Sequence, residues 1–377
     1  MPLILSGDTG VPVTTVTGTL PVANGGTGGS TPVDGFKNRI INGAMVIDQR
    51  NAGASVTITN TVALTYTLDR ILAYGAVASK FSIQQNAGAV TPPVGFTKYL
   101  GCTSLSAYSV GASDAFIVGQ AVEGLNITDL AWGTANASSI TLSFKVYSSL
   151  TGTFGGSIYN ADSTRSYPFS YSIPVANTWT TISITIPGDA TGAWATDNTA
   201  GIQLVFSLGS GSTVSGTAGA WAGASYRSAT GATSVVGTNG ATFYITGVQL
   251  EKGSTATSFD YRPYGTELAL CQRYYEKSYE IGTVAGTSTN TGKGTYVMAA
   301  GNGYWRWTQL YQVPKRTAST FTIYSTTGAS GNVRLNNSSN VAVSTEDASE
   351  HNCNVYVSYN AAVTDFFWWQ WVASAEL

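Results

Sequence analysis

Charged side chains are scarce in this 377-residue sequence. Asp, Glu, Lys and Arg make up 10% of it, and the formal net charge is −2. In an average soluble domain about a quarter of the residues are charged. A nucleic-acid-binding protein concentrates Lys and Arg on one face to neutralise phosphates. Here the basic residues are scattered along the chain, so we expect no nucleic-acid partner.

Histidine and cysteine are also rare. The sequence has one histidine, His351, and three cysteines, Cys102, Cys271 and Cys353. A serine or cysteine nucleophile normally needs a positioned base, and His351 lies in a polar stretch that we predict to be a solvated loop. The cysteines are far apart and form no CxxC pair, which favours buried free thiols over a zinc site or a disulfide framework. We expect no catalytic residue, no metal and no cofactor.

Long apolar segments are missing as well. No segment approaches the roughly 20 consecutive apolar residues that cross a bilayer, so we expect no membrane insertion. The first six residues lack the basic region and the apolar core of a signal peptide. The sequence therefore predicts synthesis in a cytoplasm without export.

Glycine and hydrophobic residues are abundant instead, with 43 glycines and 43% hydrophobic residues. Apolar and polar residues alternate in 141–146, 181–186 and 201–208, and Gly or Pro follows two of these segments directly. Period-two alternation bounded by turn residues predicts strands with one face on a core. Many such strands predict a two-sheet antiparallel sandwich, and we assign residues 36–264 to a jelly roll.

Three further segments complete the predicted all-β organisation. Residues 1–35 are an extended, glycine-rich arm that we expect to order on docking into a larger assembly; a disordered leader is the alternative. Residues 265–280 are predicted to be a connector helix, with Leu268, Cys271 and Tyr275 on one stripe and Thr266 as its cap. Residues 281–377 are predicted to form a second β-sandwich, the C-terminal tip.

The tip is rich in aromatic residues. Its final strand, residues 366–372, is apolar on both faces, which predicts a central strand or one shared between subunits. Aromatic platforms with nearby polar groups suit sugars, and they also carry protein contacts. The candidate glycan-binding residues are Asn302, Tyr304, Trp305, Arg306, Trp307, Trp368, Trp369 and Trp371. Packing in a core or a trimer interface is the alternative for each aromatic residue. Trp132, Trp179, Trp194 and Trp221 in the jelly roll are predicted to be core or rim residues.

Several separated motifs resemble a known family. They are Asn38-Arg39-Ile40-Ile41-Asn42-Gly43-Ala44-Met45 with Gln49-Arg50, Tyr66-Thr67-Leu68-Asp69-Arg70, Ile245-Thr246-Gly247-Val248-Gln249-Leu250-Glu251-Lys252-Gly253-Ser254, Phe259-Asp260-Tyr261-Arg262-Pro263-Tyr264-Gly265 and Glu267-Leu268-Ala269-Leu270-Cys271-Gln272-Arg273-Tyr274-Tyr275. Together they resemble the carbohydrate-binding-module-like jelly roll of bacteriophage tail-fibre and receptor-binding proteins. The arm at 20–28 is similar to fibre-shaft repeats, although a long shaft is missing.

This resemblance implies a virion structural protein that is assembled in the host cytoplasm. It implies a homotrimeric tail fibre whose N-terminal arm attaches to other tail or baseplate proteins. We expect the tip to contact a bacterial surface polysaccharide, because several weak sugar sites acting together give durable attachment. The resemblance carries over no ligand-binding residues. Two alternatives stay open: an architectural baseplate or capsid projection without receptor binding, and a glycan depolymerase that uses two carboxylates.

Overall fold

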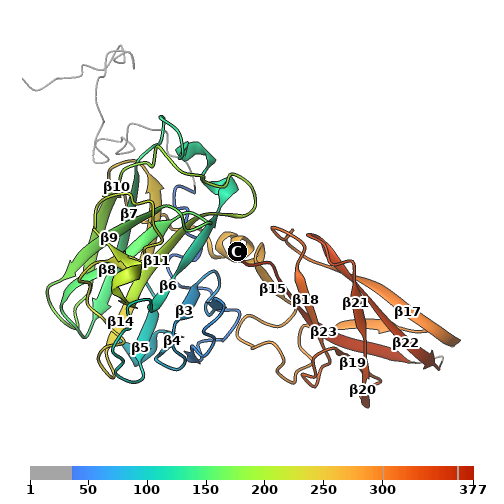
Figure 1. Ribbon diagram of the computed structural model, residues 1–377. Coiled ribbons are helices and arrows are strands. Elements are labelled where there is room, and N and C mark those ends of the chain that lie inside the picture. Colours follow the sequence, from blue (N-terminus) through green and yellow to red (C-terminus); the bar gives the residue numbers. More distant parts are fainter. Residues whose placement is uncertain (1–35, 300, 363–364) are drawn as a thin grey trace, which may run out of the picture. The chain divides into compact units, whose positions relative to one another are not determined.

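The structure of this chain is a computed structural model that describes residues 36–299, 301–362 and 365–377, without the side chain of Asn302. The chain divides into two compact units, residues 1–37 and 38–377. The predicted arm, residues 1–35, lies outside the described residues. The sections below concern the second unit, whose two β modules are drawn in Figure 1.

The first module, residues 38–252, contains fourteen of the strands in the described residues. They are β1 (Val56–Thr57), β2 (Thr65–Tyr66), β3 (Leu72–Gly75), β4 (Phe81–Gln85), β5 (Leu100–Ser104), β6 (Ala115–Glu123), β7 (Ile140–Ser148), β8 (Gly152–Tyr159), β9 (Ser166–Ile173), β10 (Thr180–Ile186), β11 (Ala200–Ser210), β12 (Ser215–Gly216), β13 (Ser228–Ala229) and β14 (Thr242–Lys252). Short 3₁₀ turns are η3 (Ala87–Ala89), η4 (Gly124–Asn126), η5 (Thr128–Leu130) and η6 (Ser212–Val214).

Two six-stranded antiparallel sheets form this module. One has the order β1-β4-β5-β14-β7-β10 and the other β2-β3-β6-β11-β8-β9. The chain passes repeatedly from one sheet to the other, as in a jelly roll. The predicted strands 141–146, 181–186 and 201–208 fall within β7, β10 and β11. The predicted jelly-roll sandwich is therefore confirmed.

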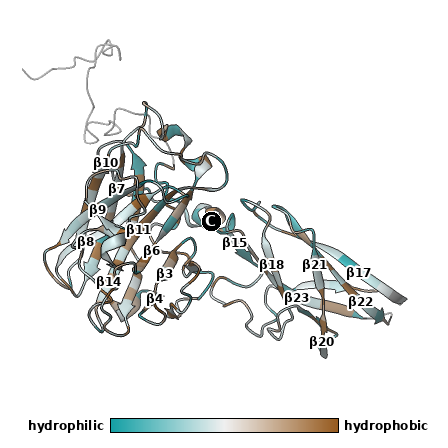
Figure 2. Cartoon of the chain, in the orientation of Figure 1, coloured by the Kyte–Doolittle hydropathy of each residue, from teal (hydrophilic) through white to brown (hydrophobic). Residues whose placement is uncertain are grey.

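The core of the jelly roll lies between the sheets, and in strands such as β7 alternate residues point into it. In β7 these residues are Ile140, Leu142, Phe144 and Val146, each at most 1% exposed. Figure 2 shows the same alternation as brown and pale segments along the strands. Because successive side chains of a strand point to opposite faces, the hydrophobic pattern fixes which face of each sheet is buried.

The connector helix is shorter than predicted. Helix α1 spans Tyr264–Gln272, and its N-cap position is Pro263 with no side-chain cap. Thr266 therefore lies within the first turn and is not the cap. Tyr275, predicted on the helical stripe, belongs to strand β15 (Tyr275–Lys277), which pairs with the last strand of the C-terminal module. The pairing of residues 275–277 with β23 prevents the helix from continuing, and the helical spacing of the sequence gives no indication of this pairing.

The C-terminal module is a second, smaller sandwich. Its strands are β15, β16 (Gly294–Val297), β17 (Gly301–Leu310), β18 (Thr320–Tyr324), β19 (Asn332–Leu335), β20 (Ser339–Ala342), β21 (Ser344–Glu346), β22 (Asn352–Ala361) and β23 (Phe366–Ser374). Strand β23 pairs with β15, β16, β18 and β19, and a three-stranded sheet has the order β17-β22-β21. The aromatic last strand is thus central in its sheet, which is one of the two predicted positions.

Polar contacts join the two modules. Glu376 forms ion pairs with Arg50 and with Arg70, whose side chain is 1% exposed. The guanidinium of Arg70 also lies 3.6 Å from the centroid of the Tyr274 ring. Lys277 Nζ donates hydrogen bonds to the carbonyl oxygens of Gln49, Ile281 and Thr283. Burial, one carboxylate partner and one aromatic ring make Arg70 a fixed point of this junction.

In the part of the chain that the structure describes, no helix is both long and apolar enough to cross a membrane.

Candidate functional site

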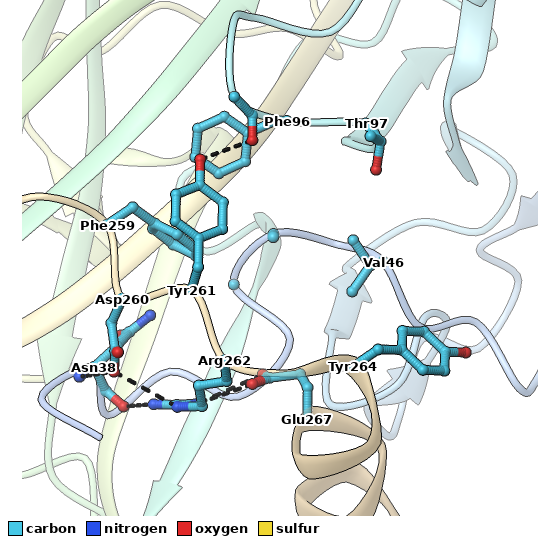
Figure 3. A pocket seen from close by; sticks show the side chains of 13 residues that line it. Asn38, Val46, Phe96, Thr97, Phe259, Asp260, Tyr261, Arg262, Tyr264 and Glu267 are labelled. Atoms are coloured by element: carbon cyan, nitrogen blue, oxygen red, sulfur yellow. Dashed lines mark hydrogen bonds and ion pairs between the residues drawn. The ribbon is translucent and has the colours of Figure 1, made fainter. Parts of the chain in front are cut away.

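A cavity of about 280 Å³ opens on the jelly roll beside the start of α1. Figure 3 shows its walls, with Tyr261 and Phe96 on one side, Val46 on the other, and Arg262 and Glu267 at the floor. Its lining residues are Asn38, Gly43, Ala44, Val46, Gly95, Phe96, Thr97, Phe259, Asp260, Tyr261, Arg262, Tyr264 and Glu267. They come from three segments that are far apart in the sequence and that include residues of three of the motifs noted above.

The first wall belongs to the loop between β4 and β5. Tyr99 organises this loop: its hydroxyl donates to the Ala87 carbonyl at 2.5 Å and accepts from the Val90 amide at 2.9 Å. Trp179 Nε1 donates to the Thr91 carbonyl at 2.9 Å. Because both ends of the loop are held, its tip presents Phe96 to the cavity in a fixed position.

A stack of aromatic rings supports the loop from below. Tyr244 of β14 lies between Tyr147 of β7 and Tyr99, with ring centroids 5.3 Å and 5.1 Å apart. Trp179 contacts Tyr99 and Tyr147, with both centroid separations at 5.5 Å. Aromatic pairs in such arrangements contribute about 0.5–1.5 kcal/mol each beyond their burial. These rings are a scaffold for the site rather than part of its lining.

Three aromatic rings meet at the wall itself. Phe96 lies 5.1 Å from Phe259 and 5.6 Å from Tyr261, and the last two are 4.9 Å apart, measured between centroids. The Tyr261 hydroxyl donates to the Gly95 carbonyl at 2.7 Å, which joins the two segments (Figure 3). Tyr261 is nevertheless 59% exposed and Tyr264 50% exposed. The wall therefore offers ring surface to a ligand.

Close backbone approach shapes the rest of this wall. Gly247 has φ +62°, and a Cβ there would lie 2.6 Å from the Phe96 ring. A Cβ on Gly43 would lie 2.2 Å from the Val248 carbonyl oxygen. Glycine is needed at both positions because a side chain would displace the lining segments. The two motifs that contain these glycines are thus locked against each other beneath the cavity.

The charged groups of the cavity are paired with each other and with the backbone. Arg262 forms ion pairs with Glu267 at 3.1 Å and with Asp260 at 3.6 Å. It also donates to the carbonyl oxygen of Asn38. Asp260 accepts from the Asn38 amide at 3.1 Å, and Glu267 accepts from the Asn42 amide. The floor is therefore a closed polar network.

The two tyrosine side chains that line the cavity carry no charge. Burial raises the pKa of Tyr261 and of Tyr264, so both phenols are neutral at neutral pH. Neutral aromatic rings can contact an apolar face of a ligand, and the ion-paired floor beside them can form hydrogen bonds with groups at the edge of that ligand. Among the described residues, no group of three or more His, Cys, Asp or Glu side chains is placed to hold a metal ion.

The residues predicted at the tip do not form one surface. Trp369 and Trp371 are each 5% exposed and belong to the core of the C-terminal module. Trp305 and Trp307 of β17 pack partly buried against the same core. The strand period turns these odd-numbered positions inward. Trp369 and Trp371 thus take the core-packing position that was the alternative for each aromatic residue.

The other predicted tip residues lie elsewhere. Tyr304 is 72% exposed on the outer face of β17, and the Arg306 side chain, 65% exposed, pairs with Glu346 at 3.4 Å. Trp368 lies on the face of β23 away from the core, where the Lys293 amine is 3.1 Å from its ring centroid. The Asn302 side chain lies outside the described part of the structure. Tyr304 and Arg306 alone keep the exposed position that the hypothesis requires.

The remaining aromatic and thiol predictions concern packing. Trp132 and Trp194 are 7% and 8% exposed, and both contact Trp221, with centroids 5.3 Å and 5.5 Å away. Trp179 belongs to the scaffold beneath the loop. These positions confirm the reading as core or rim residues. The three cysteines are buried free thiols, as predicted, and His351 is exposed.

Phe96, Tyr261 and Tyr264 were missed as candidate residues. Phe259, Tyr261 and Tyr264 lie in a motif that carried the family resemblance but no ligand assignment. Phe96 follows a Pro-Pro-Val-Gly turn and has no partner nearby in the sequence. The sequence offered one signal for Phe96, a short apolar loop between two strands. Only the fold shows that this loop contacts the motif at residues 259–265.

Comparison with known proteins gives neighbours in structure alone. No family model and no curated protein matches the chain. The enzymatically active domain of bacteriophage CBA120 tailspike protein 4 is 12% identical, with a TM-score of 0.30; the match covers 59% of this chain and 22% of that one. A putative sugar-binding protein from Bacteroides thetaiotaomicron is 13% identical, with a TM-score of 0.30; the match covers 57% of this chain and 100% of that one.

A third neighbour is a family 11 carbohydrate-binding module from Clostridium thermocellum, found in complex with a β-1,3-1,4-mixed-linked tetrasaccharide. It is 10% identical, with a TM-score of 0.26, and the match covers 54% of this chain and 98% of that one. At TM-scores this low, the similarities carry no argument about the function of this chain.

Proposed function

We propose that this chain is a carbohydrate-binding component of a bacteriophage fibre and that its jelly roll binds a sugar of a bacterial surface polysaccharide. The observation that carries the proposal is the aromatic lining of the 280 Å³ cavity, where Tyr261 is half-exposed beside Phe96 and Tyr264 is half-exposed on the opposite side (Figure 3). Sugar rings have flat apolar faces edged by hydroxyls, and an exposed aromatic ring beside polar groups suits both.

The resemblance of the chain's motifs to phage tail-fibre proteins supports the virion part of the proposal. Under this proposal, residues 1–35 attach the chain to other tail or baseplate proteins, and three copies assemble into a homotrimeric fibre. Three weak sites on one fibre would then act together on a repetitive polysaccharide. The molar mass of the purified full-length chain by light scattering tests the trimer, and labelled antibody on intact virions tests the location.

The decisive experiment is glycan binding by the full-length chain and two matched variants. Tyr261→Ala removes an exposed ring at the cavity, and Tyr304→Ala removes an exposed ring at the C-terminal module. We expect Tyr261→Ala to lower affinity for the host polysaccharide about tenfold or more, as truncation of a buried aromatic anchor does. Tyr304→Ala should leave affinity unchanged. Circular dichroism and melting curves of both variants verify that they fold.

The outcomes separate the alternatives. Loss of binding in Tyr304→Ala with normal binding in Tyr261→Ala would move the site to the C-terminal module, where Tyr304 and Arg306 are exposed. No binding of host polysaccharide by the unmodified chain would favour an architectural projection. Release of reducing sugar from the polysaccharide would instead identify a depolymerase.

A further inference from the structure

The charge of the cavity floor determines which sugars it can accept. Asp260, Arg262 and Glu267 are the charged residues among those that line the cavity. Two carboxylates and one guanidinium give this lining a formal charge of −1. A ligand that enters the cavity therefore meets a slightly negative floor.

The one positive group at the floor is already engaged. The Arg262 guanidinium has two carboxylates within 3.6 Å and donates to the carbonyl oxygens of Asn38 and Ile40. To bind an anionic ligand in a bidentate manner, Arg262 would have to leave partners that hold the lining segments together. Its side chain is 6% exposed, which leaves little room for such a rearrangement.

The walls favour an apolar substituent. Above the floor, the rings of Phe96, Phe259 and Tyr261 and the aliphatic side chain of Val46 bound the cavity, with Thr97 and Tyr264 at its edges (Figure 3). The Tyr261 hydroxyl already donates to the Gly95 carbonyl. A methyl or deoxy position of a ligand loses no hydrogen bond on entering such a wall, whereas a carboxylate loses its hydration.

We propose that the cavity selects neutral pyranosides, with preference for a methyl group at C6, and rejects uronic acids and other anionic sugars. This inference rests on the proposed function, since it names the sugar class for the same site. The cavity, at about 280 Å³, is the size of a single sugar ring rather than of an oligosaccharide. The rest of a polysaccharide chain would lie outside, along the exposed rings of Tyr261 and Tyr264.

The test uses methyl glycosides that differ only at C6, as CH₂OH, CH₃ or COO⁻, in the gluco, galacto and manno series. Binding to the full-length chain is measured by ligand-observed NMR at neutral pH. In the series that binds, we expect the 6-deoxy compound to bind at least as well as the CH₂OH compound and the uronate about tenfold more weakly. Raising the salt concentration should reduce this discrimination, because salt screens the charge of the floor.

Two variants at Thr97 assign the effect to the cavity. Thr97 is exposed at the rim, so its replacement leaves the core intact. Thr97→Trp should block the cavity and remove binding of all three compounds. Thr97→Lys should improve uronate binding relative to the CH₂OH compound by about twofold to fivefold, the size of an exposed charge interaction. Thr230→Lys adds the same charge at an exposed position outside the cavity lining and should change nothing.

The results distinguish this inference from the proposed function. If the uronate binds as well as or better than the neutral sugars and Thr97→Trp removes that binding, the cavity binds sugar but the selection of neutral sugars is refuted. If neutral sugars bind and Thr97→Trp has no effect, the cavity is not the site and both statements fail. If no compound of any series binds, and the host polysaccharide does not bind either, the proposed function itself is overturned.

Discussion

The two β modules use their aromatic residues differently. In the C-terminal module Trp369, Trp371 and Phe367 are at most 5% exposed and lie in the core itself. In the jelly roll, rings such as Phe144 also lie in the core, but a second set of rings supports and lines a cavity outside that core. A dense aromatic segment in a sequence therefore does not locate a binding surface; the strand period and the sheet position decide it.

The difference has a physical cause. The C-terminal module is small, and a small sandwich buries a smaller fraction of its surface, so large rings fill its core efficiently. The jelly roll has two six-stranded sheets, and its larger core combines many aliphatic side chains with rings such as Phe144 and Phe206. Further rings in this module lie outside the core, where they support and line the cavity. Four predictions, from the largest expected effect to the smallest, test this division.

Trp369→Ala should destabilise the C-terminal module by about 3–5 kcal/mol, the usual cost of removing a large buried ring. Trp369 lies 4.7 Å from Trp307 between ring centroids, and its Nε1 donates to Gln309 at 3.0 Å. Denaturant unfolding followed by tryptophan fluorescence measures the loss. Unchanged stability together with lost polysaccharide binding would show that Trp369 is a ligand platform, and it would contradict the statement that the rings of this module form its core.

Lys315→Met should destabilise the chain by about 3 kcal/mol, the lower end of the cost of breaking a buried ion pair. Lys315 Nζ is 2.5 Å from a carboxylate oxygen of Glu276, with side-chain exposures of 0% and 2%. The lower end applies because Glu276 keeps the amides of Gln312 and Val313 as donors. Urea unfolding gives the value. The double variant with Glu276→Gln should recover part of the stability, and a further loss would contradict the pairing.

Asp69→Asn should remove a pH dependence from the junction between the modules. Burial raises the pKa of Asp69 to about 6 from its ordinary 3.8. A carboxyl with a raised pKa stabilises the folded state fully below its unfolded pKa, and this contribution is lost as the pH rises through the folded pKa. We expect the unmodified chain to lose up to about 3 kcal/mol relative to the variant between pH 4 and pH 7. Parallel unfolding free energies across this range would refute the assignment.

Tyr304→Ala should change the free energy of unfolding by less than about 0.5 kcal/mol, as for most exposed substitutions. The Tyr304 side chain is 72% exposed on the outer face of β17. Thermal melting measures the effect. A second variant, Tyr261→Phe, removes the hydrogen bond to Gly95 but keeps the ring, and it should lower the free energy of unfolding by about 1 kcal/mol. A large loss in Tyr304→Ala would show that the outer face is covered in the assembly.

Much of the fold could be predicted from the sequence because period two is a local signal. The alternation in 141–146 and 181–186 places Leu142 and Phe144 in the core and Lys145 outside, as the structure has them. The same period accounts for the burial of Phe367 and Trp369 and for the partly exposed position of Trp368 on the other face of the strand. The end of α1 was not predictable, because the pairing of β15 with β23 joins residues about one hundred positions apart.

The site could not be predicted for a related reason. Phe96 and Tyr261 are separated by more than one hundred and fifty residues, and nothing in either segment alone indicates that their rings meet. The family motifs did mark the right segments, since Gly43, Gly247 and Tyr261 lie in three of them. Their spacing contains no information on the cavity, which depends on how the β4–β5 loop is held by Tyr99 and Trp179.

The pairing of Arg70 with Glu376 has a consequence for the order of events during synthesis. The two residues are 306 positions apart, so the jelly roll has left the ribosome well before Glu376 is synthesised. Until then the Arg70 guanidinium lacks this carboxylate, and it has to remain hydrated because burial of an unpaired charge is costly. The junction can therefore form only after residue 376 has been synthesised, and a product that stops before it would leave the Arg70 guanidinium without this carboxylate.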